Sequence, residues 1–527
     1  MATERRPHRK NNSGFVLNNQ TLLILVGILS AVLVVLLVIS GSLINNDTTN
    51  PGSNAMNNSG SQGSSSSVIP GSTGSTGSTG TTQPSSGAAT QPSSTPATTP
   101  PPVTPSGGNY VDVGSGYIAE VIQVNIETFD GDTYDDYSHP TNNYLPEGTL
   151  DYCKKDLIYG SNMKYVLLRS GHRVYYDKKV YPFEYGTSKM IPEVKQYEGW
   201  LPDHNEIGVV SLETVGRHSI LTLDSMWKAP FYFETNQSGY SNPKGGKDRD
   251  YAVVSNNATY IDITFCYTTV FTGKVTIPAN HPLFKSAEII QNESDYTLRL
   301  HLRKAGALYG WHAYYNDNDQ LCFQFLNPAK ASVADNKYGA DLSSTTVMID
   351  VGHGGVDGGA VAKDTEGTEW DEAHLNLMLA NALKAELESM GATVILNRTD
   401  DSPLNVNVRQ EQFLETSPDI CIAIHQNANN DKSIRGYYSY YYTPWSQALA
   451  KNIYEHTKAS GVYTRNFLQW KANYFMDRQT VCPTVLTENG FMSNADDLAA
   501  MIDPVSVQNK AAAIAQGVAD YFLDINK

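Results

Sequence analysis

The first marked feature of this 527-residue chain is an apolar run, Leu22–Ile44, which contains 23 residues and no charge. At 1.5 Å rise per residue, a helix of that length spans about 35 Å, more than the hydrocarbon core of a bilayer at about 30 Å. Arg5 and Arg6 precede the run, so the positive charge favours a cytoplasmic tail at residues 1–21. A cleaved signal peptide is the alternative, although its apolar region is usually only about 7–15 residues long. We therefore predict one transmembrane helix at 22–44, with the remainder extracellular.

Residues 45–109 contain mostly Ser, Thr, Gly, Pro, Asn and Gln, including the repeat GSTGSTGSTG. Such a segment offers almost no apolar side chains for a core, so we predict a disordered linker. A flexible chain of about 64 residues has a root-mean-square span near 45 Å. The linker is therefore expected to hold the exported part of the chain away from the membrane.

From residue 110 to about residue 340, apolar and polar side chains alternate with a period of two. The alternation is clearest in the segments Ile261–Tyr267, Tyr296–Arg303 and Leu321–Phe325. It turns one side of each strand toward a core and the other side, with Cys266 and Cys322, toward water. The segment Asn316–Asp319 is a turn signal and predicts a hairpin. We predict one or two antiparallel β domains over residues 110–340.

The β-rich region also contains a group of aromatic side chains whose role the pattern leaves open. The group consists of Tyr309, Trp311, Tyr314 and Tyr315. Exposed aromatic rings can stack on sugar rings, which would suit a carbohydrate-binding surface. Aromatic residues are also favoured in strands for their packing, so a sandwich core is the alternative.

From residue 344 to residue 527, short apolar strands alternate with helical periodicity. Strands are predicted at 346–351, 393–396, 420–424 and 484–486, and helices at 371–390, 446–459 and 505–522. Gly391 follows the first helix as a stop signal. This alternation predicts an α/β domain with a mixed sheet and helices on both of its faces.

Chemically active side chains follow three of these strands. His353 and Glu488 each follow a strand, and His425 ends the strand CIAIH. In α/β sheets, functional residues gather at the carboxyl ends of strands. Glu372 opens the first helix, where a carboxylate gains from the helix N-terminus. Two imidazoles and a carboxylate with an open fourth position are typical of a hydrolytic zinc site, and a second carboxylate can move protons.

Composition excludes several other classes of function. With 38 Lys and Arg against 54 Asp and Glu, the formal net charge is −16, which is a poor match for nucleic acid. The five cysteines form no CxxC pair, so a thiolate zinc knuckle and a redox pair are excluded. We expect buried free thiols, with a Cys153–Cys266 bridge as the alternative. The loop GHGGVDGGA lacks the GK[ST] of a Walker motif and the third Gly of GxGxxG.

Four motifs occur in order: IDVGHGGVDGGA, EAHLNL, AIHQNA and LTENGFMSN. Together they resemble the zinc-dependent N-acetylmuramoyl-L-alanine amidases, a family of bacterial cell-wall hydrolases, over residues 345–525. The resemblance implies zinc ligands at His353, Glu372 and His425, with Glu488 as the catalytic acid/base. It also implies that the substrate is peptidoglycan, cleaved between N-acetylmuramic acid and L-alanine. The region 110–340 would then be a candidate wall-binding domain.

Some positions depart from the family pattern. Val351 stands before the Gly-His pair, and Asn489 replaces an apolar residue beside Glu488, but neither change removes a ligand. The loop before Glu372 is longer than usual, which leaves Glu369 as an alternative ligand. Arg398 also matches a recurrent family position, for which we expect a structural role.

Three other functions remain open at this stage. The chain could be a non-catalytic peptidoglycan-binding or regulatory protein, although all four expected site residues are present. It could also be a zinc peptidase that cuts within the stem peptide. The last alternative is a structural surface protein in which the β-rich region carries the function.

Overall fold

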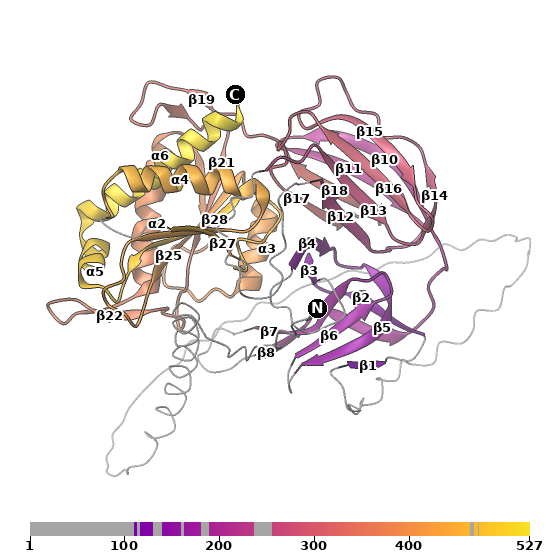
Figure 1. Cartoon of the computed structure of the whole chain (residues 1–527), viewed down its shortest axis with the longest axis horizontal. Coiled ribbons are helices and arrows are strands. Elements are labelled where there is room, and N and C mark those ends of the chain that lie inside the picture. The colour runs from indigo at the N-terminus through magenta and orange to yellow at the C-terminus, as the bar shows by residue number, and fades with distance from the viewer. Residues whose placement is uncertain are drawn as a thin grey trace, which may run out of the picture. The chain divides into compact units, whose positions relative to one another are not determined.

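The computed structural model in Figure 1 describes residues 110–112, 116–129, 140–159, 163–180, 189–236, 256–463, 468–472 and 474–527. The predicted cytoplasmic tail, the predicted transmembrane helix at 22–44 and the predicted linker lie outside these residues. Within them, no helix is both long and apolar enough to cross a membrane.

The first β structure is a nine-stranded sheet of mostly short strands, drawn in indigo to magenta in Figure 1. The strands are β1 (Tyr110–Asp112), β2 (Tyr117–Val121), β3 (Ile126–Phe129), β4 (Pro140–Leu145), β5 (Leu150–Tyr159), β6 (Met163–Leu168), β7 (Arg173–Val180), β8 (Lys189–Pro192) and β9 (Val194–Glu198). All their pairings are antiparallel. An apolar cluster that includes Ala119, Leu145 and Val166 forms the core of this structure.

The second β structure consists of two sheets that share one core. One sheet contains β10 (Asn205–Val215), β11 (His218–Ser225), β14 (Thr268–Thr272), β17 (Trp311–Tyr315) and β18 (Leu321–Leu326). The other contains β12 (Phe231–Thr235), β13 (Tyr260–Phe265), β15 (Phe284–Gln291) and β16 (Tyr296–Leu302). Inward side chains of both sheets, such as Ile263 and Phe323, form a single buried cluster. The predicted hairpin is confirmed, because β17 and β18 pair across a turn that Asn316 N–H closes on Gln320 O at 3.0 Å.

The structure decides between the two interpretations of the aromatic group for Trp311. This side chain is fully buried and stacks on Phe233, with ring centroids 3.8 Å apart. Tyr309 and Tyr315 are half-buried and pack against the same core. These side chains therefore support the sandwich rather than an open aromatic surface.

The expected burial of the thiols is confirmed, although strand alternation places Cys266 and Cys322 on the side that faces water. Strand β13 ends at Phe265, Cys266 is 6% exposed and Tyr267 turns with φ +63°. Cys322 is 2% exposed although it lies on the side of β18 expected to face water, because Thr222 of the neighbouring strand covers its sulfur at 3.8 Å. All five cysteines are buried free thiols, so no Cys153–Cys266 bridge forms.

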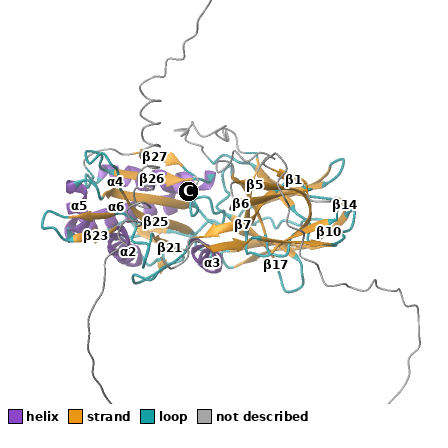
Figure 2. Cartoon of the chain, turned by 90° about the horizontal axis from the view of Figure 1, so that it is seen from below, coloured by secondary structure: helices purple, strands orange, loops and turns teal. Residues whose placement is uncertain are grey.

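The α/β part carries all the helices found among the described residues, as the purple ribbons of Figure 2 show. Its helices are α2 (Glu372–Ser389), α3 (Val406–Thr416), α4 (Gln447–Ala459), α5 (Ala495–Ile502) and α6 (Pro504–Ile525), with a short 3-10 helix η1 (Pro444–Ser446). Its main sheet contains β21 (Thr346–Val351), β24 (Thr393–Leu396), β25 (Ile420–Asn427), β26 (Tyr437–Tyr441), β27 (Leu468–Lys471) and β28 (Thr484–Phe491). Two small hairpins consist of β19 (Ser332–Val333) with β20 (Ala340–Asp341) and β22 (Val361–Lys363) with β23 (Glu369–Asp371).

The main sheet has the order β24-β21-β25-β28-β26-β27 and is mixed, as predicted. The first four strands run parallel, and β26 runs antiparallel to β28. Helices α2, α4 and α6 supply the apolar side chains that cover one face. On the other face, α3 is the helix that contributes, through Phe413, together with Met476 and Val481 from the segment before β28. Helices therefore occur on both faces, but far more on one than on the other.

Helix α2 begins and ends where the sequence predicts. Asp371 caps its N-terminus by accepting from the backbone N–H of His374 at 2.8 Å. Gly391 follows its C-terminus with φ +89°, a conformation that glycine adopts without strain. This cap fixes the position of Glu372, the first residue of the helix.

Candidate active site

Three neighbouring parallel strands bring the predicted site residues to one edge of the main sheet. Strand β21 pairs with β25, and β25 pairs with β28. His353 lies two residues beyond β21, while His425 and Glu488 lie directly opposite each other on β25 and β28. The predicted convergence of these positions is therefore observed, although β25 and β28 continue past the predicted strand ends at 424 and 486, so His425 and Glu488 lie within the strands.

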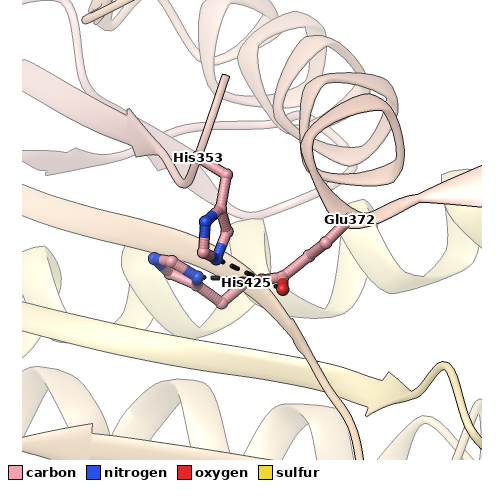
Figure 3. Close-up of side chains that lie close together, drawn as sticks. All are labelled: His353, Glu372 and His425. Carbon is pink, nitrogen blue, oxygen red and sulfur yellow. Dashed lines mark hydrogen bonds and ion pairs between the residues drawn. The ribbon is translucent and has the colours of Figure 1, made fainter. Parts of the chain in front are cut away.

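Figure 3 shows how the two imidazoles approach one carboxylate. Nε2 of His353 lies 3.2 Å from Oε2 of Glu372, and Nδ1 of His425 lies 2.9 Å from Oε1. One possible ligand atom from each of the three residues lies within 4.8 Å of the other two. The carboxylate is buried, and the two imidazole side chains retain 25% and 21% exposure. The cluster therefore has a protected side and a side that solvent can reach.

Two glycines of the loop motif are explained by this close approach. A Cβ added to Gly352 would lie 2.3 Å from Cε1 of His425. A Cβ added to Gly359, which also has φ +68°, would lie 2.6 Å from Oε2 of Glu372. Any side chain at either position would displace the cluster, so the Gly-rich loop makes room for it.

Hydrogen bonds fix the orientation of Glu372. Its Oε1 accepts the backbone N–H of Gln426 at 3.1 Å, and its Oε2 accepts that of Ala360 at 3.1 Å. Asn376, one turn further along α2, donates to Gly352 O at 3.2 Å. The carboxylate is thus held by the strand that carries His425 and by the glycine-rich loop.

The sequence alone did not identify two residues that orient His353. Asp357 lies 3.0 Å from Nδ1 of His353 and leaves Nε2 directed at Glu372. Arg409 donates to His353 O at 2.8 Å and forms a buried ion pair of 2.5 Å with Asp350. His353 itself has φ +61°, an uncommon backbone conformation that its surroundings must hold in place. Asp357 is signalled only by its place four residues after His353, and Arg409 by nothing in the sequence pattern.

Arg398 has the structural role expected of it. Its guanidinium donates to the backbone oxygens of Gly352 and Ala373, both at 2.8 Å. It thereby joins the loop before His353 to the first turn of α2. The alternative ligand Glu369, in contrast, is exposed and lies 3.7 Å from Lys363, outside the cluster.

The charges of the cluster stabilise one another. Burial alone would lower the pKa of His353, but Asp357 and Glu372 outweigh it and raise that pKa to about 10. Burial alone would raise the pKa of Glu372, but His353 and His425 hold it well below its usual range. The carboxylate therefore stays charged beside a positive charge. A divalent cation can replace the proton on His353 in this arrangement.

The three side chains fit a zinc ion in donor type and spacing. Ligand atoms bound tetrahedrally to one Zn²⁺ at about 2.0–2.2 Å lie roughly 3.3–3.6 Å apart. The separations of 3.2 and 2.9 Å run to the two different oxygens of Glu372 and are somewhat shorter, while one ligand atom from each residue lies within 4.8 Å of the others. Two His and one Glu with a solvent-facing side also form the donor set of catalytic rather than structural zinc sites.

Glu488 is suited to proton transfer. Burial raises its pKa to about 7, and the Glu372 carboxylate adds to the rise, against the two imidazoles. Its Oε2 is buried and has no hydrogen-bond partner in the described part of the chain. A carboxyl group with a pKa near neutrality can both accept and release a proton, as a general acid/base must.

Comparison with known proteins shows which family and which relatives the α/β part resembles. Residues 347–520 match the family model described as N-acetylmuramoyl-L-alanine amidase. The N-acetylmuramoyl-L-alanine amidase LytC of Bacillus subtilis (strain 168) is 28% identical over 198 residues, which cover 37% of this chain and 39% of LytC. The probable cell wall amidase LytH of Staphylococcus aureus is 32% identical over 193 residues, which cover 36% of this chain and 63% of LytH. The chain thus spans less than two thirds of the length of either relative.

Among solved structures, the catalytic domain of the amidase CwlV from Bacillus (Paenibacillus) polymyxa var. colistinus is 28% identical. The match covers 34% of this chain and 99% of that domain, with a TM-score of 0.32. The family match falls on the α/β part and includes all four predicted site residues. Residues 347–520 are therefore similar in sequence to the N-acetylmuramoyl-L-alanine amidase family.

Proposed function

We propose that this protein is a zinc-dependent N-acetylmuramoyl-L-alanine amidase that hydrolyses peptidoglycan. The observation that carries the proposal is the group of His353, Glu372 and His425 with Glu488 on the adjacent strand. The family match and the names of the relatives support the choice of the bond between N-acetylmuramic acid and L-alanine.

In this proposal His353, Glu372 and His425 hold the zinc. When bound, zinc acidifies a water molecule and polarises the substrate carbonyl. Glu488 accepts a proton from the attacking water, because its carboxylate lies beside the ligands and has a pKa near neutrality. It then donates that proton to the L-alanine nitrogen as the carbon–nitrogen bond breaks. A free amine leaves, and the muramic acid keeps its lactyl carboxylate.

We further propose that the enzyme is anchored at a bacterial cell surface. The apolar run Leu22–Ile44, with Arg5 and Arg6 before it, supports a single-pass anchor with a cytoplasmic N-terminus. The Ser/Thr/Gly/Pro-rich residues 45–109 would let the catalytic domain reach a wall layer some tens of ångströms from the membrane.

The direct test is digestion of purified peptidoglycan by the full-length protein, with the fragments identified by mass. The proposal expects stem peptides that begin with a free L-alanine amine and glycan strands with intact muramic acid. His425→Ala should abolish release, whereas His374→Ala should not, because His374 is an exposed histidine of the same helix that carries Glu372. Cleavage inside the stem peptide would identify a peptidase instead. Binding of peptidoglycan without any cleavage would identify a non-catalytic wall protein.

A further inference from the structure

Strands β25 and β28 lose their regular pairing immediately beyond the site residues. The register holds as far as the pair His425–Glu488 and then shifts, because β28 has two residues where β25 has one. A bulge of this kind interrupts the ladder and leaves backbone groups without their usual partners. The first residue of the bulge is Asn489, which is fully buried.

The side chain of Asn489 takes over part of the interrupted ladder. Its Nδ2 donates to the backbone O of His425 at 3.1 Å. The same group lies 3.0 Å from both the backbone O and Oγ1 of Thr487, whose hydroxyl donates to Ala423 O at 3.1 Å. One amide therefore joins the backbone of His425 to the strand that carries Glu488.

The third member of the cluster is held from the opposite side of β25. Strand β21 ends at Val351, and beyond it the backbone N–H of Gln426 donates to Oε1 of Glu372 at 3.1 Å. Glu372 is therefore bonded on the side of β25 that faces β21, while Asn489 holds the His425 carbonyl on the side that faces β28.

Asn489 is itself fixed from two sides. Tyr463 donates its hydroxyl to Oδ1 of Asn489 at 3.1 Å, which determines which end of the amide faces His425. Lys510 of α6 donates to the backbone O of Asn489 at 2.9 Å. Tyr463 and Lys510 are only 5% and 2% exposed, so water competes little for these hydrogen bonds. The amide has one orientation available to it.

We propose that Asn489, oriented by Tyr463 and Lys510, is a positioning residue that fixes His425 relative to Glu488. The inference rests on the proposed function, because it assigns His425 to zinc and Glu488 to proton transfer. Asn489 does not touch the reacting atoms in this role. It acts by holding the two strand ends at one spacing where the backbone ladder no longer does so.

The test replaces the amide by an apolar side chain of similar size, Asn489→Leu, in the full-length protein. Outer residues that orient metal ligands typically contribute about 10–100-fold to metal affinity or activity. We expect zinc affinity, measured by chelator competition, and kcat on peptidoglycan each to fall within that range, while KM changes less than threefold. Tyr463→Phe, which removes only the partner of Oδ1, should show a smaller loss in the same two quantities.

A matched control separates positioning from general loss of stability. Val518→Ala removes buried methyl groups from α6 in the main core, away from the strand ends. It should lower thermal stability while zinc affinity and kcat stay near wild type at 25 °C. The proposal would be overturned if Asn489→Leu and Val518→Ala lost zinc affinity and kcat equally. It would also be overturned if Asn489→Leu kept the zinc affinity and kcat of the wild type.

Two further outcomes remain decisive. If Asn489→Leu does not fold, Tyr463→Phe carries the test, and unchanged zinc affinity together with unchanged kcat overturns the proposal. If the wild-type protein binds zinc but releases no peptide, the proposed function fails on its own. The ratio of zinc affinities between variant and wild type then still decides whether Asn489 positions His425.

Discussion

Replacing Glu488 by Gln should separate proton transfer from metal binding. The substitution keeps the size and hydrogen-bonding capacity of the side chain but removes its ability to accept a proton. Glu488 lies outside the 4.8 Å group of His353, Glu372 and His425, so the zinc content should stay at the wild-type level. The expected result is a folded, zinc-loaded protein that has lost most of its turnover.

The size of the loss follows from the environment of Glu488. Burial raises the pKa of Glu488 to about 7, so its acid and base forms are almost equally populated at neutral pH. A group poised in this way contributes about 10²–10⁴-fold to a rate. The corresponding increase in the activation free energy is about 3–5 kcal/mol. A neighbouring divalent cation would lower this raised pKa and favour the carboxylate form, which accepts the first proton.

Glu372→Gln is the matched comparison, because it also replaces one carboxylate oxygen by an amide nitrogen, at the other carboxylate of the site. Glu372 lies between two imidazoles and accepts two backbone N–H groups, so the loss of its charge weakens the metal site directly. Zinc affinity should fall by at least about 100-fold, which is the upper end of the range for residues that only orient ligands.

The assay measures zinc content and peptide release on both variants at equal protein concentration. Excess zinc should restore part of the activity of Glu372→Gln and none of that of Glu488→Gln. Loss of zinc from Glu488→Gln with retention in Glu372→Gln would show that the two roles are reversed. Full activity of Glu488→Gln would refute the proposed mechanism.

Three further predictions concern stability and topology. Arg409→Met leaves the buried Asp350 carboxylate without its cationic partner. Urea titrations should show the free energy of unfolding lowered by about 3–5 kcal/mol, and the loss should be smaller when Arg409→Met is combined with Asp350→Asn. Burial lowers the pKa of His172 to about 4, so the unfolded chain binds more protons between pH 6.5 and 4. The free energy of unfolding should therefore fall by about 3 kcal/mol over that range, and this loss should be absent from His172→Gln. Protease added to intact cells should degrade the chain beyond about residue 110 and leave a membrane fragment that contains Leu22–Ile44, whereas a soluble product that begins after residue 44 would contradict the anchor.

The main features of the α/β part could be predicted because its strands are short apolar runs that end in polar residues. His353, His425 and Glu488 follow such runs, and parallel strands bring their carboxyl ends to the same edge of a sheet. The long helix at Glu372–Ser389 was predicted from its apolar face and its glycine stop. Each of these signals is local, so the sequence alone contains it.

Helix α3 could not be predicted in the same way. Its buried residues are Arg409, Gln410 and Phe413, so the side that faces the protein is mainly polar. Apolar periodicity, on which helix prediction depends, is therefore weak there. The role of Arg409 becomes visible only in three dimensions, where its guanidinium meets Asp350 and the backbone of His353.

The burial of Cys322 illustrates a second limit. A strand pattern indicates which side chains share a face, but not whether a neighbour also covers the opposite face. In β18 five of the six residues are buried, including Cys322 beside Thr222 of β11. Alternation alone cannot separate a sheet with one wet face from a sheet covered on both sides.

Hydrogen bonds within the protein fix the orientation of the cluster residues. The backbone N–H groups of Gln426 and Ala360 hold Glu372, Arg409 holds the carbonyl of His353, and Asn489 holds that of His425. In the proposed zinc site, ligands held in this way would lose little conformational entropy on binding a cation. The metal affinity of the proposed site would then depend also on residues that never contact the metal, and substitutions at those residues should affect the proposed catalysis through the geometry of the ligands.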